Sequence, residues 1–469
     1  MSAREPYDAH AFREQGARVL DALARELERA NGARDDDAPV MPREKAADLA
    51  ARFPAHFTPD GDGQFIDHVE RAIASSTRLH APRFVGHQVA TPLPAAALCD
   101  LVASFMNNGM AVYEMGPAAT AMERAVLQWM TKLAGLPADS SSGVLTSGGS
   151  IGNLTALLAA RQAQAKRIGF DAWRRGLKGG PQLVVLVAET AHYSVARAAR
   201  ILGLGDDGVV SVDVDASLRM VPSALEAALV AVRKRKREPI AVVASAGSTA
   251  VGAIDPLEAI ADVCARDKLW MHVDGAHGAS LLLSEQRRHT LRGIERADSI
   301  VWDAHKLMMM PALVTAVLFR DAAAGAGAFA QDAGYLFDDA DAGDDVGRRT
   351  VECTKRMMSL KLYACLRAFG TRLFADHVDR RCALATSLAA KVRARGGDVL
   401  AEPSMNIVCF RPRGIDGGRV AALRKRILDD GRFYIVQLHW RGELWLRCTL
   451  SHPLTSEHDL DALLDEVFA

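Results

Sequence analysis

The side chains best suited to chemistry stand at or just after the ends of apolar, β-branched segments in the middle of the chain. They are His192, Asp274 and Lys306. Ligands of open parallel sheets bind beyond the carboxyl ends of the strands, so we expect these three side chains on one rim. A lysine there can form a Schiff base with an aldehyde, and a carboxylate can pair with a pyridinium nitrogen and keep it protonated.

A glycine-containing turn supplies the remaining part of such a site. The stretch TSGGSIGN (146–153) opens a predicted helix, whose first N–H groups suit a phosphate. Ser245 and His305 fall on the same predicted rim. Each feature also has an ordinary explanation: a common turn, a helix-capping aspartate, a core histidine or a solvated lysine. Together they indicate a site for pyridoxal phosphate.

The segments that must position these residues alternate between apolar runs and helical patterns. Near-continuous apolar strands separated by helices indicate a mostly parallel sheet covered on both faces. The predicted strands are 182–189, 208–215, 240–247, 269–276, 299–305 and 313–320, and helices are predicted at 222–236 and 255–267.

The rest of the chain is organised around this α/β region. We expect an amphipathic helix at 11–30, a linker with one short helix at 31–60, helices within 92–134, a surface loop at 322–350, helices at 359–370 and 375–395, and a small α+β domain at 404–469. The predicted domains are an N-terminal helical segment (1–85), a large cofactor-binding domain (86–335), and a loop with the small C-terminal domain (336–469).

Composition excludes several classes of protein. The chain has 469 residues, and its 57 Lys and Arg balance 57 Asp and Glu, which argues against a nucleic-acid or membrane-surface partner. The seven cysteines have no zinc-site spacing, so we expect no metal and read them as reduced thiols of a cytoplasmic protein. We identify no signal peptide, and no apolar run approaches the roughly 20 residues that span a bilayer.

Four stretches resemble a known family: AHYSVARAA (191–199), SAGSTAVGAIDP (245–256), HVDGAHG (272–278) and WDAHK (302–306). They look like the group II pyridoxal-phosphate decarboxylases, which include glutamate, aromatic-amino-acid, cysteine-sulfinate and 2,4-diaminobutyrate decarboxylases. The resemblance runs from about residue 11 to the C-terminus. It implies the type I fold of these enzymes, with a mixed, mostly parallel seven-stranded sheet flanked by helices, a small α+β C-terminal domain and an intertwined homodimer.

The resemblance also implies a role for each matching residue. Lys306 would be the Schiff-base lysine, Asp274 would hold the ring nitrogen, and His192 and Ala276 would lie on opposite ring faces. Gly149, Ser150 and His305 would hold the phosphate, Arg447 would bind the substrate α-carboxylate, and His87 would lie at the mouth of the site.

The chain departs from its relatives where some of them carry a tyrosine that reprotonates the α-carbon. The matching place, near Asp344–Val346, has no tyrosine, and Tyr335 lies earlier. Without that donor, decarboxylation could be coupled to oxidative deamination, which gives an aldehyde. In the interpretation we favour, His192 or water donates the proton and the product is an amine.

A second departure concerns the substrate side chain. Glutamate decarboxylases place an arginine where this chain has Leu438, and Arg441 lies at a shifted position. With Trp440 or Met308–Met310 nearby, an apolar or aromatic wall would suit a neutral or a cationic side chain. We therefore predict decarboxylation of such an amino acid. A non-catalytic dimeric paralogue is disfavoured because the lysine, aspartate and histidine are all present.

Overall fold

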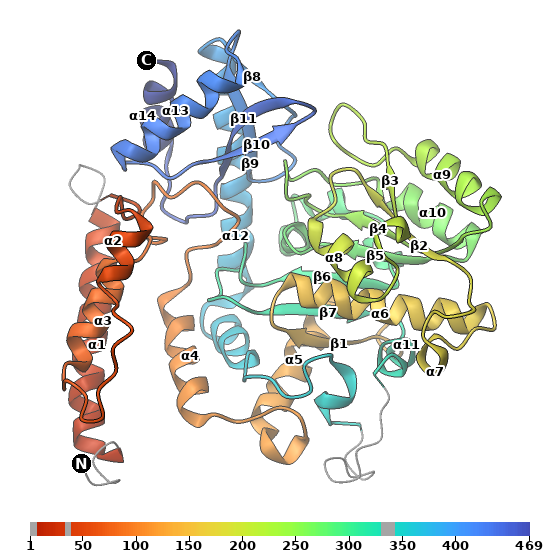
Figure 1. Cartoon of the computed structure of the whole chain (residues 1–469), viewed down its shortest axis with the longest axis horizontal. Coiled ribbons are helices and arrows are strands. Elements are labelled where there is room, and N and C mark those ends of the chain that lie inside the picture. Colours follow the sequence, from red (N-terminus) through yellow and green to blue (C-terminus); the bar gives the residue numbers. More distant parts are fainter. Residues whose placement is uncertain (1–6, 33–38, 330–342) are drawn as a thin grey trace. The chain divides into compact units, whose positions relative to one another are not determined.

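The computed structural model describes residues 7–32, 39–329 and 343–469 (Figure 1). The chain divides into two compact units, which are described separately. Unit 1 comprises Met1–His87, Ala390–Asp398 and Cys409–Ala469, and unit 2 comprises Gln88–Ala389 and Val399–Val408. This grouping does not test the three-part division expected from the sequence, which stays a prediction.

Unit 2 is built on a seven-stranded sheet with the order β1-β7-β6-β5-β4-β2-β3. Only β7 runs against its neighbours, since its pairings with β1 and β6 are antiparallel and the other pairings are parallel. The strands are β1 (Ser142–Thr146), β2 (Leu183–Ala188), β3 (Val209–Val212), β4 (Glu238–Ser245), β5 (Trp270–Asp274), β6 (Ser299–Asp303) and β7 (Thr315–Phe319).

Both faces of this sheet are buried. Val185 and Val243 belong to one apolar core with residues of α6 (Gly149–Arg167) and α8 (Tyr193–Ile201). Leu186 and Val242 alternate with them and point to the opposite face, yet they are fully buried as well. Helices α9 (Pro222–Lys234) and α10 (Leu257–Asp267) pack against β4. The predicted covered sheet is confirmed.

The six strands predicted from apolar runs are β2 to β7, and the two helices predicted between them are α9 and α10. The runs did not predict β1, which lies at the edge of the sheet. Helices α4 (Pro94–Met106) and α5 (Pro117–Leu133) occupy the helical region 92–134. The long helix α12 (Ser359–Ala394) is interrupted at Gly370, whose φ of 71° is not helical, which matches the prediction of two helices there.

The predicted surface loop at 322–350 is wrong in part. It begins with α11 (Ala322–Gly327) and contains a short 3₁₀ helix, η7 (Val346–Arg349). Asp345 is buried, and one of its carboxylate oxygens accepts the backbone N–H of Tyr113 at 3.0 Å. This bond holds the end of the segment against the protein. Residues 330–342, with Tyr335 among them, lie outside the described residues.

Unit 1 contains helices and most of a small sheet. Its helices are α1 (Ala9–Gly32), α2 (Ala46–Ala51), α3 (Phe65–Ala74), α13 (Gly417–Asp430) and α14 (Glu457–Phe468). The sheet has the order β10-β11-β9-β8, formed by β8 (Gly397–Val399), β9 (Ile407–Pro412), β10 (Val436–Trp440) and β11 (Glu443–Thr449). These elements confirm the predicted α+β character of 404–469. Among the described helices, none combines the length and apolar character that crossing a membrane requires.

Candidate functional site

One cavity in unit 2 collects the predicted cofactor-site residues. It is lined by Gly149, Ser150, His192, Ser245, Asp274, Ala276, His305 and Lys306. These residues come from the ends of β1, β2, β4, β5 and β6, so the expected rim exists and its side chains face one space.

The turn after β1 is shaped for an anion. Gly148 has a φ of 105°, a conformation that favours glycine, and α6 begins at Gly149 with no side chain capping its first N–H groups. A Cβ on Gly149 would lie 3.0 Å from a carboxylate oxygen of Asp303, so the backbone approaches this side chain closely. The start of a 19-residue helix without a side-chain cap among the described residues suits a phosphate.

Lys306 lies three residues beyond β6 and is held by a buried carboxylate. Its Nζ is 2.9 Å from Oδ2 of Asp303, and Thr315 donates its hydroxyl to Oδ1 at 2.5 Å. Burial alone would raise the pKa of Asp303, but the charges of Lys306 and His305 and these hydrogen bonds hold it below its usual value. Asp303 is therefore the anionic partner of the lysine. Burial lowers the pKa of His305, whose Nδ1 is 2.9 Å from the carbonyl oxygen of Val314.

Asp274 is the last residue of β5 and is 9% exposed. Its Oδ2 accepts a hydrogen bond from Nδ2 of Asn153 at 3.0 Å, and its Oδ1 accepts the backbone N–H of Ala276 at 3.2 Å. These two donors fix the plane of the carboxylate. An oriented carboxylate in this cavity can pair with a protonated ring nitrogen.

His192 precedes the first residue of α8. Its Nδ1 lies 2.7 Å from the hydroxyl of Ser194 and 3.3 Å from the backbone N–H of the same residue. Burial lowers the pKa of His192 despite the opposing charge of Asp274, which favours the neutral ring. A neutral imidazole held at one edge presents its other ring atoms to the cavity.

The two residues expected to contact substrate, His87 and Arg447, lie in unit 1. Arg447 is 6% exposed on β11, and burial lowers the pKa of its guanidinium group. Burial, and then the positive charges of Arg447 and Arg424, lower the pKa of His87. Unit 1 therefore carries a local positive potential beside His87, which suits an anionic group. Arg424 was not predicted from the sequence.

The strand register of unit 1 locates the residues that were considered for the substrate side chain. Val436 pairs with Arg447 and Leu438 pairs with Trp445, so Leu438 and Arg447 lie on the same face of the sheet. Arg441 follows the end of β10 with a φ of 46°, and its guanidinium lies 5.2 Å from the ring centre of Trp440. It lies three residues beyond Leu438, which is roughly 10 Å along an extended chain. It does not occupy the place of the missing arginine.

Two functional candidates in unit 2 were missed by sequence reasoning. Asp303 stands inside the quoted motif WDAHK, three residues before the lysine, which was a usable signal. Asn153 carried no local signal, because its partners Asp274 and His272 are more than 100 positions away in the chain.

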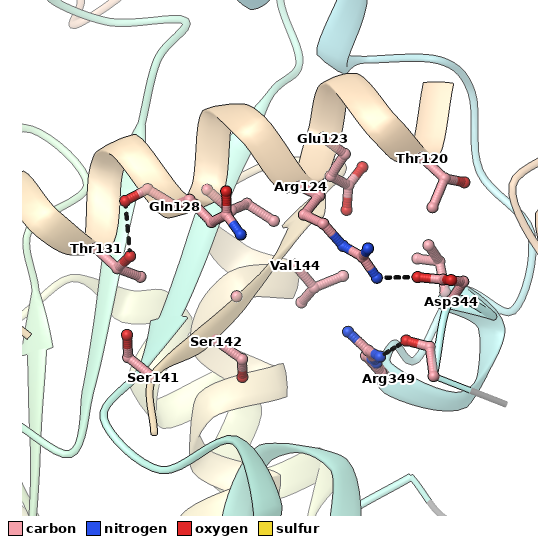
Figure 2. Close-up of a pocket in the computed structure, with 14 residues that line it drawn as sticks. Thr120, Glu123, Arg124, Gln128, Thr131, Ser141, Ser142, Val144, Asp344 and Arg349 are labelled. Atoms are coloured by element: carbon pink, nitrogen blue, oxygen red, sulfur yellow. Dashed lines mark hydrogen bonds and ion pairs between the residues drawn. The ribbon is translucent and has the colours of Figure 1, made fainter. Parts of the chain in front are cut away.

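A second cavity in unit 2 lies along α5 and the amino-terminal part of β1 (Figure 2). Figure 2 shows Arg124 reaching from α5 to the carboxylate of Asp344, and Arg349 donates to the carbonyl oxygen of Gly343. No lysine lines this cavity among the described residues. It therefore lacks the group that a Schiff base requires, and the first cavity is the candidate site.

Comparisons with known proteins agree with the geometry. The family model described as "Pyridoxal-dependent decarboxylase conserved domain" matches residues 47–413. Cysteine sulfinic acid decarboxylase of Mus musculus is 32% identical over 424 residues, covering 86% of this chain and 85% of the relative. Acidic amino acid decarboxylase GADL1 of Homo sapiens is 32% identical over 392 residues, covering 78% of this chain and 74% of the relative. The crystal structure of mouse CSAD has a TM-score of 0.91 and 30% identity, with 98% of both chains covered.

The residues of the first cavity fit pyridoxal phosphate. The uncapped start of α6 at Gly149 and Ser150 lines the cavity and could hold a phosphate, the Lys306 amine could take an aldehyde, and Asp274 could pair with a ring nitrogen. The donor set and the comparisons therefore indicate the same cofactor.

Proposed function

The chain belongs to the pyridoxal-dependent decarboxylase family, and from that premise we propose that its substrate is an L-amino acid with a neutral or cationic side chain, released as the amine and carbon dioxide. Family membership itself gives the type of reaction: the protein is a pyridoxal-phosphate-dependent carboxy-lyase of amino acids. The observation that supports the proposed preference for a neutral or cationic side chain is Leu438, which lies on the same face of the unit 1 sheet as Arg447.

The cofactor supplies an electron sink for the pair left behind when the bond from the α-carbon to the carboxylate breaks. In our proposal Lys306 binds the cofactor covalently and Asp274 holds a proton on its ring nitrogen, which keeps the sink strong. Asn153 and the Ala276 N–H hold the Asp274 carboxylate in one orientation. His192 lines the same cavity and would limit the orientations of the bound substrate.

Arg447 is proposed to bind the substrate α-carboxylate. The bond that breaks must be held in one orientation, and a carboxylate anchored by Arg447 would lose the freedom to rotate away. The guanidinium is buried, so a carboxylate bound to it is shielded from water. Loss of solvent favours the departure of neutral carbon dioxide.

The proposed preference follows from the residue beside this anchor. A second substrate carboxylate near Leu438 would be buried without a partner, which costs several kcal/mol. Each 1.4 kcal/mol corresponds to about a tenfold change in specificity. Acidic substrates should therefore be disfavoured by orders of magnitude.

A second candidate substrate class is acidic, and two observations favour it. Both curated relatives carry acidic substrates in their names, and Arg424 adds a second positive charge near His87. The deciding experiment measures kcat/KM in parallel for glutamate, cysteine sulfinate, 2,4-diaminobutyrate, a neutral aliphatic and an aromatic amino acid. If an acidic substrate is preferred, the Leu438 argument is wrong, and Arg424→Gln should then lose that substrate selectively.

The aldehyde-forming alternative rests on the 344–346 segment. In the described residues it offers Asp344, Asp345 and Val346, and the Asp345 side chain is buried against Tyr113. We propose amine formation with another proton donor. Product analysis with and without oxygen separates the two, because aldehyde, ammonia and peroxide would form only when oxygen is present.

We also propose that the protein is a cytoplasmic homodimer. Helix α4 exposes Leu98, Leu101 and Phe105, with Phe105 66% exposed, and a second copy of the chain would cover this apolar face. All seven cysteines are free thiols, as expected in a reducing compartment. Sedimentation should give twice the mass of the chain, and Phe105→Glu should shift it toward the monomer. A wild-type monomer would contradict the assembly.

A further inference from the structure

Asn153 joins the two proposed cofactor contacts through one chain of hydrogen bonds inside unit 2. Its Nδ2 lies 3.0 Å from Oδ2 of Asp274 and 2.9 Å from the hydroxyl of Ser194. Its Oδ1 lies 2.9 Å from Nε2 of His272. The side chain is 1% exposed, so these three contacts satisfy it without bulk water.

The partners fix the direction of each bond. An ionised carboxylate only accepts, so the amide nitrogen of Asn153 must face Asp274, and the amide oxygen must face His272. Burial lowers the pKa of His272 to about 4, so its ring is neutral at physiological pH. Because its Nε2 faces an acceptor, that nitrogen carries the single ring proton.

The hydrogen bonds on the other side of the His272 ring are consistent with this assignment. Nδ1 of His272 then accepts, and the hydroxyl of Ser299 donates to it at 2.9 Å. The Ser299 oxygen in turn accepts the indole N–H of Trp270 at 2.8 Å. Each proton in this branch has one acceptor, so the orientation of Asn153 is set from both sides.

The other branch reaches His192. The Ser194 oxygen accepts from Asn153, so its own hydroxyl proton is directed to Nδ1 of His192 at 2.7 Å. The backbone N–H of Ser194 points to the same nitrogen at 3.3 Å. Two donors at Nδ1 leave no room for a proton there, so the neutral ring carries its proton on Nε2.

We propose that Asn153 is a positioning residue that orients the Asp274 carboxylate and, through Ser194, keeps the ring proton of His192 on Nε2. The inference rests on the roles proposed for Asp274 and His192. Its consequence is an N–H donor on the ring edge away from Ser194, in a chain whose matching tyrosine position holds Asp344–Val346 instead. A ring with the opposite tautomer could not donate from that edge.

The tautomer is measurable without catalysis. Long-range ¹H–¹⁵N correlation spectra of cofactor-free protein labelled at histidine distinguish Nδ1–H from Nε2–H rings, and His192→Asn identifies the signal. We expect Nε2–H in the wild type, a mixture of tautomers in Ser194→Ala and Asn153→Leu, and recovery in Ser194→Thr. Thr155→Val is the matched control, because Thr155 is buried on the same helix and its hydroxyl has no partner among the described residues. An Nδ1–H ring in the wild type, or an unchanged signal in Ser194→Ala, would overturn the proposal.

Cofactor binding tests the second branch. Asn153→Leu removes the donor to the charged Asp274, and losing such a bond should weaken the affinity for pyridoxal phosphate about tenfold to a hundredfold. Ser194→Ala leaves that donor in place and should change the affinity by less than about threefold. The affinity is obtained by titrating cofactor-free protein. Equal effects of the two variants would overturn the Asp274 branch, whereas a failure to decarboxylate any amino acid would refute the proposed function and leave both measurements valid.

Discussion

Two of the lysine–carboxylate pairs among the described residues of unit 2 have different surroundings. Lys306 lies 2.9 Å from Asp303, its side chain is 17% exposed, and both residues line the cofactor cavity. Lys355 lies 2.5 Å from Glu123 with a side chain that is 1% exposed. Lys355 also donates to the carbonyl oxygen of Leu145 at 2.6 Å, and Glu123 accepts the Leu145 N–H at 3.0 Å.

The difference separates an amine that opens to a cavity from one that is enclosed. The Lys355 ammonium is closed in between a carboxylate and strand β1, and burial lowers its pKa against the pull of Glu123. Lys306 has the same kind of partner, but its amine is open to a cavity that an aldehyde can enter. Access to the amine, and not the presence of an anionic partner, distinguishes the two sites.

The largest expected effect is on activity, when Lys306 is replaced by alanine. We expect Lys306→Ala to lose activity by about 10³-fold or more, as happens when a covalent catalytic group is removed. Borohydride reduction of the wild type followed by peptide mapping should label Lys306 and leave Lys355 unlabelled. A label on Lys355, or on any lysine other than Lys306, refutes the assignment.

The sequence predicted the site of Lys306 but not the surroundings of Lys355. The ends of apolar segments predicted Lys306, Asp274 and His192, because strand direction places such ends on one rim. The sequence did not predict β1, because its segment SGVLT contains only two large apolar residues, Val144 and Leu145, and so shows no apolar run. The partners Asn153 and Glu123 depend on contacts between distant segments, which no local pattern encodes.

The next test compares the two lysines by their contributions to the free energy of unfolding. Lys355→Met leaves Glu123 charged, buried and without its lysine, which should cost about 3–5 kcal/mol of unfolding free energy. Lys306→Met should cost less, because Asp303 keeps its hydrogen bond from Thr315 and lies beside a cavity. Urea unfolding of both cofactor-free variants provides the comparison. The double variant Glu123→Gln with Lys355→Met should regain part of the loss, and equal losses in the two single variants would contradict the contrast.

The pH dependence of stability tests the hydrogen bonds that join Asn153 to His272. The pKa of His272 is lowered by burial from 6.5 to about 4, so its contribution to stability is fully present above about pH 6.5 and is lost as the pH falls toward 4. That difference corresponds to a loss on the order of 3 kcal/mol. Asp255 opposes it, because burial raises its pKa to about 6 and acid therefore favours its folded form.

The measurement is therefore a difference between two proteins. Wild type and His272→Gln are unfolded in urea at several values between pH 4 and 7, and the variant should lose less stability on acidification. Asp255 is present in both and cancels. Parallel curves would mean that the folded protein protonates His272 as readily as the unfolded chain does, and the hydrogen bond between Ser299 and Nδ1 of His272 would then run from the ring to the hydroxyl.

The smallest expected effect on binding concerns Asp274. Asp274→Asn should keep the fold, because the new amide can turn its oxygen toward the Asn153 donor and gives up only the 3.2 Å hydrogen bond from the Ala276 N–H. It then loses the negative charge opposite the cofactor ring, which should weaken cofactor binding by about 1.5–3 kcal/mol. Catalysis should fall further than binding does, because an amide cannot keep the ring nitrogen protonated while charge develops on the α-carbon. Titration of cofactor into the variant gives the first quantity, and kcat at saturating cofactor gives the second. Near-normal turnover would remove Asp274 from the mechanism, while a loss confined to affinity would make it a cofactor-binding residue only.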